Sequence, residues 1–124
     1  MDKKKLIDRI LREATFTLQV VEDSTPVRGN AMASGDEAYD REVEEGILSR
    51  LDEGDIWGWA WIHMTATWNG LEGEDSLGGC SYEDEADFIK NSGYYEDMKF
   101  VAAERIATEF LRIGQKFTEI SAEV

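Results

Sequence analysis

Acidic side chains crowd the middle of this chain. Between Asp36 and Asp97 there are eighteen carboxylates and only three basic side chains, Arg41, Arg50 and Lys90. That segment holds about fifteen net negative charges, while the rest of the chain is nearly neutral. Carboxylates at this density can bind a positively charged partner or hold a divalent cation, and the two kinds of chemistry require different spacings.

A metal site is not indicated by the spacing. Neither Asp52 to Asp55 nor Glu72 to Asp75 has the alternating ligands of an EF-hand loop. A zinc site needs several Cys or His ligands, and the chain has one of each. The glycines of Leu77-Gly78-Gly79-Cys80 do not form a phosphate-loop pattern. We therefore expect no metal and no cofactor.

The single His and the single Cys are the remaining residues that could carry out catalysis. His63 lies within a long apolar run, and Ser76 is its expected partner across a hairpin. A Ser–His pair without a third group or an oxyanion motif does not make a catalytic site, so we interpret His63 as a structural strand residue. Cys80 has no adjacent cation or resolving Cys, which indicates a small core residue. We predict that the protein is not an enzyme.

A partner-binding surface is the remaining interpretation of the acidic segment. Like charges four residues apart each oppose helix formation by a few tenths of a kcal/mol, yet Asp36, Asp40 and Glu44 form such a row. The acidic excess recurs on a helix face, a hairpin tip and a helix start. Solubility alone explains acidity in many proteins, but the concentration in one segment favours binding. The predicted partner-binding residues are Asp36, Glu37, Asp40, Glu44, Glu45, Asp52, Glu53, Asp55, Glu72, Glu74, Asp75, Glu83, Asp84, Glu85 and Asp87.

Three elements are expected to precede and carry the first carboxylates. An amphipathic helix is predicted by the spacing of Leu6, Ile7, Ile10, Leu11 and Ala14. Alternation of Phe16, Leu18 and Val20 predicts a strand that ends before Pro26, and the stretch from Val27 to Ala33 has no clear period. Ser34-Gly35-Asp36-Glu37 reads as a capping box that begins a second helix. On that helix Tyr39, Val43, Leu48, Ile47 and Leu51 should pack, and Asp40 and Glu44 should lie on an acidic face.

A long hairpin should follow. Residues 56 to 68 read as a strand, and Asn69-Gly70 favours a two-residue type I′ turn. Opposing residue numbers then sum to 139, which pairs His63 with Ser76. Trp57, Trp59 and Trp61 fall on one face, either as the floor under a helix or as an exposed stripe for a partner, and core packing is favoured.

Two helices are expected after the hairpin. Ser81 is a candidate cap for a short helix through Phe88 and Ile89. The final helix, roughly 96 to 120, should be the longest. Its apolar stripe packs on the sheet or partly pairs with its copy in a homodimer, and it consists of Ala103, Ile106, Phe110, Ile113, Phe117 and Ile120. The fold class is α+β: a small antiparallel sheet of about three strands with four helices.

Composition limits the possible domain organisation, partners and location of the protein. The 124 residues, 42% apolar with a net charge of −14, predict a single acidic domain over residues 1–124. Direct binding to nucleic acid or anionic membranes conflicts with the charge. With one Cys and no apolar run after Met1-Asp2-Lys3, we expect a cytoplasmic location.

Three segments carry a resemblance to other proteins. Residues 68–73, 77–82 and 93–98 resemble small uncharacterised proteins of phages and mobile elements, over the central half of the chain. In size, acidity and lack of catalytic residues the chain is similar to phage anti-defence proteins that mimic DNA, including anti-CRISPR inhibitors. This resemblance implies an inhibitor in the host cytoplasm whose partner is a basic nucleic-acid-binding protein, such as a CRISPR effector complex. The alternatives are a homodimeric accessory protein of a mobile element and a divalent-metal-dependent hydrolase.

Overall fold

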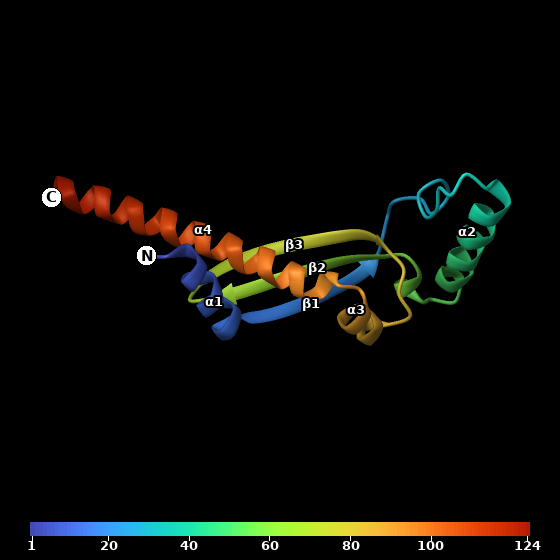
Figure 1. Cartoon of the computed structure of the whole chain (residues 1–124), viewed down its shortest axis with the longest axis horizontal. Helices are drawn as coiled ribbons and strands as arrows, with labels where there is room; N and C mark the ends of the chain where they lie inside the picture. The colour runs from blue at the N-terminus through green and yellow to red at the C-terminus, as the bar shows by residue number, and fades with distance from the viewer. The chain divides into compact units, whose positions relative to one another are not determined.

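The computed structural model describes all 124 residues and has an α+β fold. The sheet has three antiparallel strands in the order β1-β2-β3, and α4, with 30 residues, is the longest of four helices (Figure 1). These findings confirm the expected fold class. The elements are α1 (Lys3–Glu13), β1 (Thr15–Glu22), α2 (Glu37–Asp52), the 3-10 turn η1 (Ile56–Gly58), β2 (Ala60–Trp68), β3 (Leu71–Cys80), α3 (Glu85–Asn91) and α4 (Tyr94–Glu123).

The chain divides into two compact units that share the strands. Unit 1 comprises Met1–Leu18, Met64–Asp75 and Glu96–Val124. Unit 2 comprises Gln19–His63 and Ser76–Tyr95. Each strand contributes residues to both units, and the expectation of one domain over residues 1–124 stays a prediction.

In unit 1, α1 and the first half of α4 provide the core against the strands. Leu6, Ile7 and Ile10 of α1 are buried, which confirms the amphipathic helix. On α4, Ala102 and Ile106 are fully buried. Helix α4 can approach β3 closely because residue 73 is glycine: a Cβ added there would overlap the backbone oxygen of Ala102.

Aromatic and polar contacts tie the same helices to β1 and β2. The ring of Phe110 meets Trp68 edge-on at 5.5 Å between centroids. The indole N–H of Trp68 donates to Glu13 at 3.0 Å, so α1 satisfies the polar group of this buried tryptophan. On β1, Lys99 of α4 lies 5.0 Å from the ring centroid of Phe16. One face of the unit 1 strands is therefore covered by helices.

The hairpin has the predicted turn and register. Asn69 and Gly70 have φ of 49° and 81°, as a type I′ turn requires. His63 Nδ1 and Ser76 Oγ lie 2.7 Å apart, and the Tyr82 N–H donates to the Trp57 carbonyl at 3.0 Å; in both pairs the residue numbers sum to 139. Residues of β2 alternate between buried and partly exposed, which is the period expected of a sheet with one covered face.

The start of β2 differs from the prediction. Residues 56–58 form a 3-10 turn because Asp55 accepts the N–H of Trp57 at 3.1 Å and its carbonyl accepts that of Gly58. The three tryptophans consequently reach different surroundings: Trp57 lies 5.9 Å from the Phe88 ring, Trp59 is buried, and Trp61 stacks on His63 at 5.1 Å. They form neither a common floor nor a common stripe.

One buried cluster of unit 2 includes part of the segment without a predicted element. Val27, Ile47 and Trp59 are buried together, with Val43 and Leu51 among the half-buried residues packed against them. The Trp59 indole N–H donates to the Thr25 carbonyl at 2.7 Å. Tyr39 is 48% exposed and is not part of this core, because steps of four residues drift around a helix of 3.6 residues per turn.

Both helix caps in unit 2 lie at aspartates and not at the predicted serines. Asp36, not Ser34, caps α2 by accepting the N–H groups of Ala38 at 3.1 Å and Tyr39 at 3.2 Å. Asp84, not Ser81, caps α3 by accepting from the Asp87 N–H at 2.8 Å. Aspartate competes well with serine as a cap because its full charge also interacts favourably with the helix dipole.

Candidate partner-binding surface

The two units carry very different charge. Unit 2 has fifteen carboxylates and four basic side chains, a net charge of −11. Unit 1 has twelve carboxylates and nine basic side chains, a net charge of −3. Of the fifteen predicted partner-binding residues, twelve lie in unit 2; the hairpin residues Glu72, Glu74 and Asp75 lie in unit 1. Most of the candidate surface therefore belongs to unit 2.

Glu44 was expected on the acidic face of α2 and is instead buried, with 8% of its surface exposed. Its carboxylate accepts the Gly29 N–H at 2.6 Å and pairs with Arg28 at 3.4 Å. The helix period explains the error: Glu44 is three residues before Ile47 and seven before Leu51, so it shares their face. A buried carboxylate in this place anchors the loop after β1 and is not available to a partner.

Asp40 also faces inward. It is half-buried and accepts from the Ser34 hydroxyl at 2.6 Å and from the Ser34 N–H at 3.1 Å. Together with the cap at Asp36, this bond fixes the turn that leads into α2. Two further members of the predicted set therefore act in local structure.

Three more carboxylates of the set have internal partners. Asp55 pairs with Arg50 at 2.8 Å, in addition to its bond to the Trp57 N–H. Asp87 accepts from the Asn91 side chain at 2.8 Å and from the Glu83 N–H at 2.9 Å, and these bonds hold the pKa of Asp87 below its usual value. Asp84 is the cap of α3.

Six predicted residues of unit 2 remain exposed, and their carboxylates make no hydrogen bond or ion pair. We refer to them as the open carboxylates: Glu37, Glu45, Asp52, Glu53, Glu83 and Glu85. Four belong to α2 and its C-terminal cap, and two belong to the start of α3. Glu45 and Asp52 are seven residues apart and so lie on one face of α2. Glu42 is equally exposed on α2 and is missing from the predicted set, although its position away from the Ile47 face could have identified it.

Of the four basic side chains of unit 2, Arg28 and Arg50 are held in internal contacts, while Arg41 and Lys90 are exposed. Arg50 is held by Asp55 and by the Tyr82 carbonyl at 2.6 Å, and Arg28 is paired with Glu44. These contacts use two of the four basic side chains for internal structure. The excess negative charge of unit 2 is therefore exposed to solvent and is screened mainly by salt.

At the hairpin tip in unit 1, Glu72 and Glu74 are exposed and Asp75 is half-buried. Their exposure agrees with a tip that carries charge into solvent. These three residues belong to unit 1 and are not counted among the open carboxylates.

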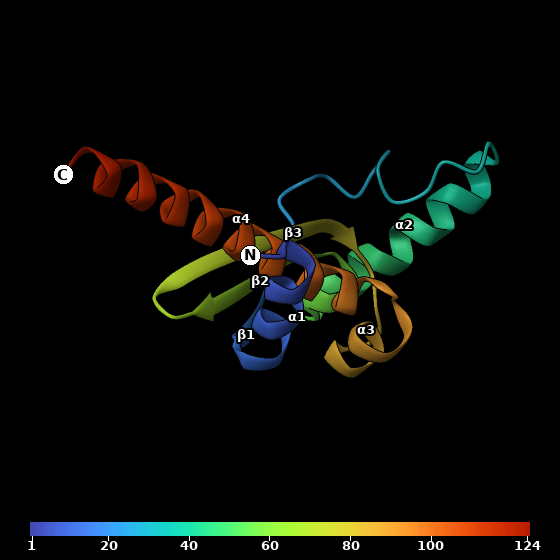
Figure 2. The ribbon, with the colours of Figure 1, turned by 60° about the vertical axis from the view of Figure 1, so that its left-hand side comes forward.

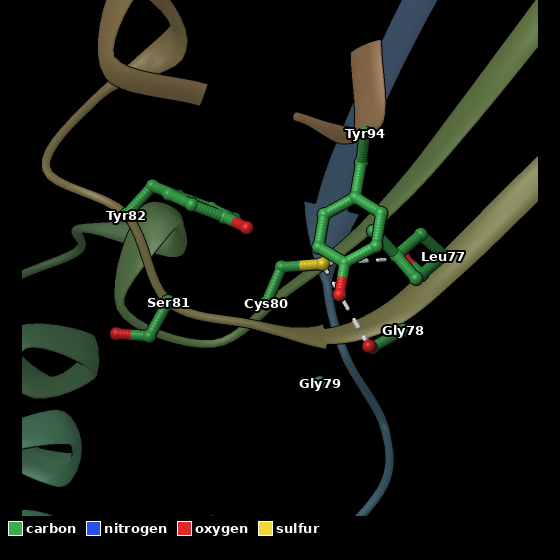
Figure 3. Close-up of a pocket in the computed structure, with 7 residues that line it drawn as sticks. All are labelled: Leu77, Gly78, Gly79, Cys80, Ser81, Tyr82 and Tyr94. Carbon is green, nitrogen blue, oxygen red and sulfur yellow. Dashed lines mark hydrogen bonds between the residues drawn. The ribbon is translucent and has the colours of Figure 1, made fainter. Parts of the chain in front are cut away.

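A shallow hollow of about 360 Å³ lies at the end of β3 (Figure 3). Tyr82 and Tyr94 flank it, and the Cys80 thiol points into the space near Tyr94. Burial and the nearby Asp23 carboxylate raise the pKa of Cys80 to about 11, so the thiol is protonated at neutral pH and is a poor nucleophile. Its S–H lies 3.7 Å from the carbonyls of Leu77 and Gly78. This agrees with a structural role for Cys80.

Asp23 is a structural carboxylate that the sequence analysis did not identify. It accepts the Gly79 N–H at 2.6 Å and the Thr25 N–H at 2.8 Å, joining the end of β1 to the end of β3. Burial alone would raise the pKa of Asp23, but the two backbone donors outweigh it and the pKa is lowered. The sequence Asp23-Ser24-Thr25 is typical of a turn and could have indicated this structural role.

No group of three or more His, Cys, Asp or Glu side chains is arranged to hold a metal ion. None of the helices combines the length and the apolar composition needed to cross a membrane. No family model matches the chain, and neither a curated protein nor a solved structure shows significant similarity to it.

Proposed function

We propose that this protein is an inhibitor of the phage anti-defence type, similar in mode to DNA-mimicking anti-CRISPR proteins. It binds a basic nucleic-acid-binding protein through the open carboxylates of unit 2 and blocks that protein's DNA site without catalysis. The observation that carries the proposal is the net charge of −11 on unit 2 together with six carboxylates that have no internal partner. A surface of this kind is complementary to a DNA-binding channel.

The physical basis is the charge that DNA-binding proteins are built to recognise. Duplex DNA carries about one negative charge per 1.7 Å of axis, and its partners meet it with Lys and Arg. Carboxylates pair with the same side chains through charge-assisted hydrogen bonds. Carboxylates fixed on α2, whose cap and inner face are held by Asp36 and Glu44, pay less ordering entropy on binding than a flexible acidic tail.

The test compares how strongly matched charge-reversal variants inhibit the DNA binding of the partner protein. Glu45→Lys combined with Asp52→Lys changes two open carboxylates of α2, and neither residue has a structural bond. The control is Asp8→Lys combined with Glu123→Lys, which makes the same change in net charge at exposed positions of unit 1. Proteins captured from a bacterial lysate by the wild-type chain are then tested for duplex binding in the presence of each variant.

We expect the wild-type protein and the unit 1 control to release duplex DNA from the captured protein, and the α2 variant to do so at least about tenfold less well. Inhibition should weaken steeply with added salt, since both partners exchange counterions. The proposal fails if no captured protein binds nucleic acid, or if the α2 variant inhibits as well as the control.

A further inference from the structure

The C-terminal half of α4 exposes apolar side chains at regular spacing. Ile113, Phe117 and Ile120 are 43%, 72% and 53% exposed, and we call them the C-terminal stripe. They continue the pattern of Ala103 and Ile106, which are buried. Figures 1 and 2 both show the last turns of α4 with no other segment of unit 1 beside them. One apolar pattern thus has a packed half and an unpacked half.

The unpacked half receives little support from its own unit. Isolated helices shorter than about 12–15 residues are marginal in water, and the segment from Leu111 onward is of that length. It also contains Gly114, which costs about 1 kcal/mol in a helix interior relative to Ala. Apart from the neighbouring backbone of α4 itself, no atom lies within 4 Å of where a Gly114 Cβ would be, so internal packing does not require this glycine. A partner that covers the stripe would account for both the helix and its exposed apolar residues.

The charge of the segment indicates what kind of partner fits. Between Phe110 and Val124, Arg112 and Lys116 are balanced by Glu119 and Glu123. Both cations are paired along the helix, Arg112 with Glu109 at 2.6 Å and Lys116 with Glu119 at 3.9 Å. The whole chain has a net charge of −14, whereas the charges of the side chains in this segment balance. A basic partner would favour unit 2, whereas a neutral apolar partner fits the C-terminal stripe.

A second copy of the same segment is such a partner. Two-fold symmetry brings identical surfaces together, and balanced, internally paired charges meet there with little repulsion. The alternating steps of three and four residues from Phe110 to Ile120 are those of a coiled-coil seam. Gly114, next to that seam and without a side chain, allows a neighbouring helix to approach closely. We infer that the protein forms a homodimer through the C-terminal stripes of two α4 helices.

The experiment is sedimentation velocity of the full chain over a range of concentrations at moderate salt. The test variant Phe117→Asp places a charge in the stripe, and the control Gln115→Asp places the same charge two residues away on the same exposed helix. The wild-type chain and Gln115→Asp should sediment as dimers, and dimerisation of Phe117→Asp should be at least about tenfold weaker. Circular dichroism checks that the variants remain folded, since Phe117 is not part of the core.

Two results would overturn the inference. One is a wild-type chain that stays monomeric at about 100 µM, a concentration at which even a weak specific dimer is populated. The other is a Phe117→Asp variant that dimerises like the control. The outcome is separable from the proposed inhibition, because Phe117→Asp retains every open carboxylate of unit 2.

Discussion

Unit 1 and unit 2 satisfy their backbones and fill their cores in different ways. Unit 1 relies on close helix-on-sheet packing, in which Gly73 and Ala102 let α4 approach β3. Unit 2 has an apolar cluster around Trp59 and uses carboxylates as acceptors at caps, turns and a loop. A count of acidic residues therefore overstates the charge available to a partner. Half of the predicted unit 2 residues stabilise the fold.

The largest expected effect tests the packing of unit 1. Gly73→Ala places a Cβ against the backbone of Ala102, which cannot move without displacing α4. We expect a loss of about 3 kcal/mol in the free energy of unfolding, at the upper end of the usual range for overpacking. Urea denaturation measures it.

Gly46→Ala in α2 is the matched change in unit 2. Nothing lies within 4 Å of its added Cβ, and alanine is the better helix former, so we expect a gain of up to about 1 kcal/mol. Equal effects of the two substitutions would contradict the described difference in packing.

A second prediction separates structural from open carboxylates within unit 2. Glu44→Ala removes the acceptor of the Gly29 N–H and the partner of Arg28, so we expect a loss of about 1–3 kcal/mol. Glu45→Ala, next to it in the chain but exposed, should change the free energy of unfolding by no more than about 0.5 kcal/mol. Thermal unfolding of both variants provides the comparison. A destabilisation shared by both would mean that exposure does not distinguish their roles.

The smallest effect concerns acid stability. The pKa of Asp23 is lower in the folded protein than in the unfolded chain, where it is about 3.9. Its contribution to stability is therefore complete above the unfolded pKa and is lost as the pH falls below about 4, through the folded pKa. Asp23→Asn keeps an acceptor for the Gly79 N–H but cannot titrate, so stability should depend less on pH below about 4. Unfolding midpoints measured at several acidic pH values test this.

In unit 1, Glu13 allows the same measurement of acid stability. The Trp68 indole N–H and Arg9 lower the pKa of Glu13. Glu13→Gln should likewise weaken the acid dependence, with the Trp68 fluorescence as a local reporter. An unchanged pH profile in both variants would show that other carboxylates dominate acid unfolding.

Local sequence patterns predicted most of the elements. The Asn69-Gly70 turn determined the hairpin and its register, because few other dipeptides adopt positive φ at both positions. Helical periodicity located α1, α2 and α4 to within a few residues. The misplaced strand start at Ile56 and the misplaced caps share one cause: an aspartate side chain bonded to nearby N–H groups where a serine or an extended backbone was expected.

What the sequence determined by itself was the fold class, the order of the elements and the excess of negative charge, since each depends on neighbouring residues or on composition alone. Only the tertiary structure decided which carboxylates face solvent and where the three tryptophans go. Glu44 is buried because a donor from Gly29, fifteen residues away along the chain, meets it. Contacts between distant segments set the burial of a side chain, and burial decides whether a charge stabilises the fold or remains available for binding.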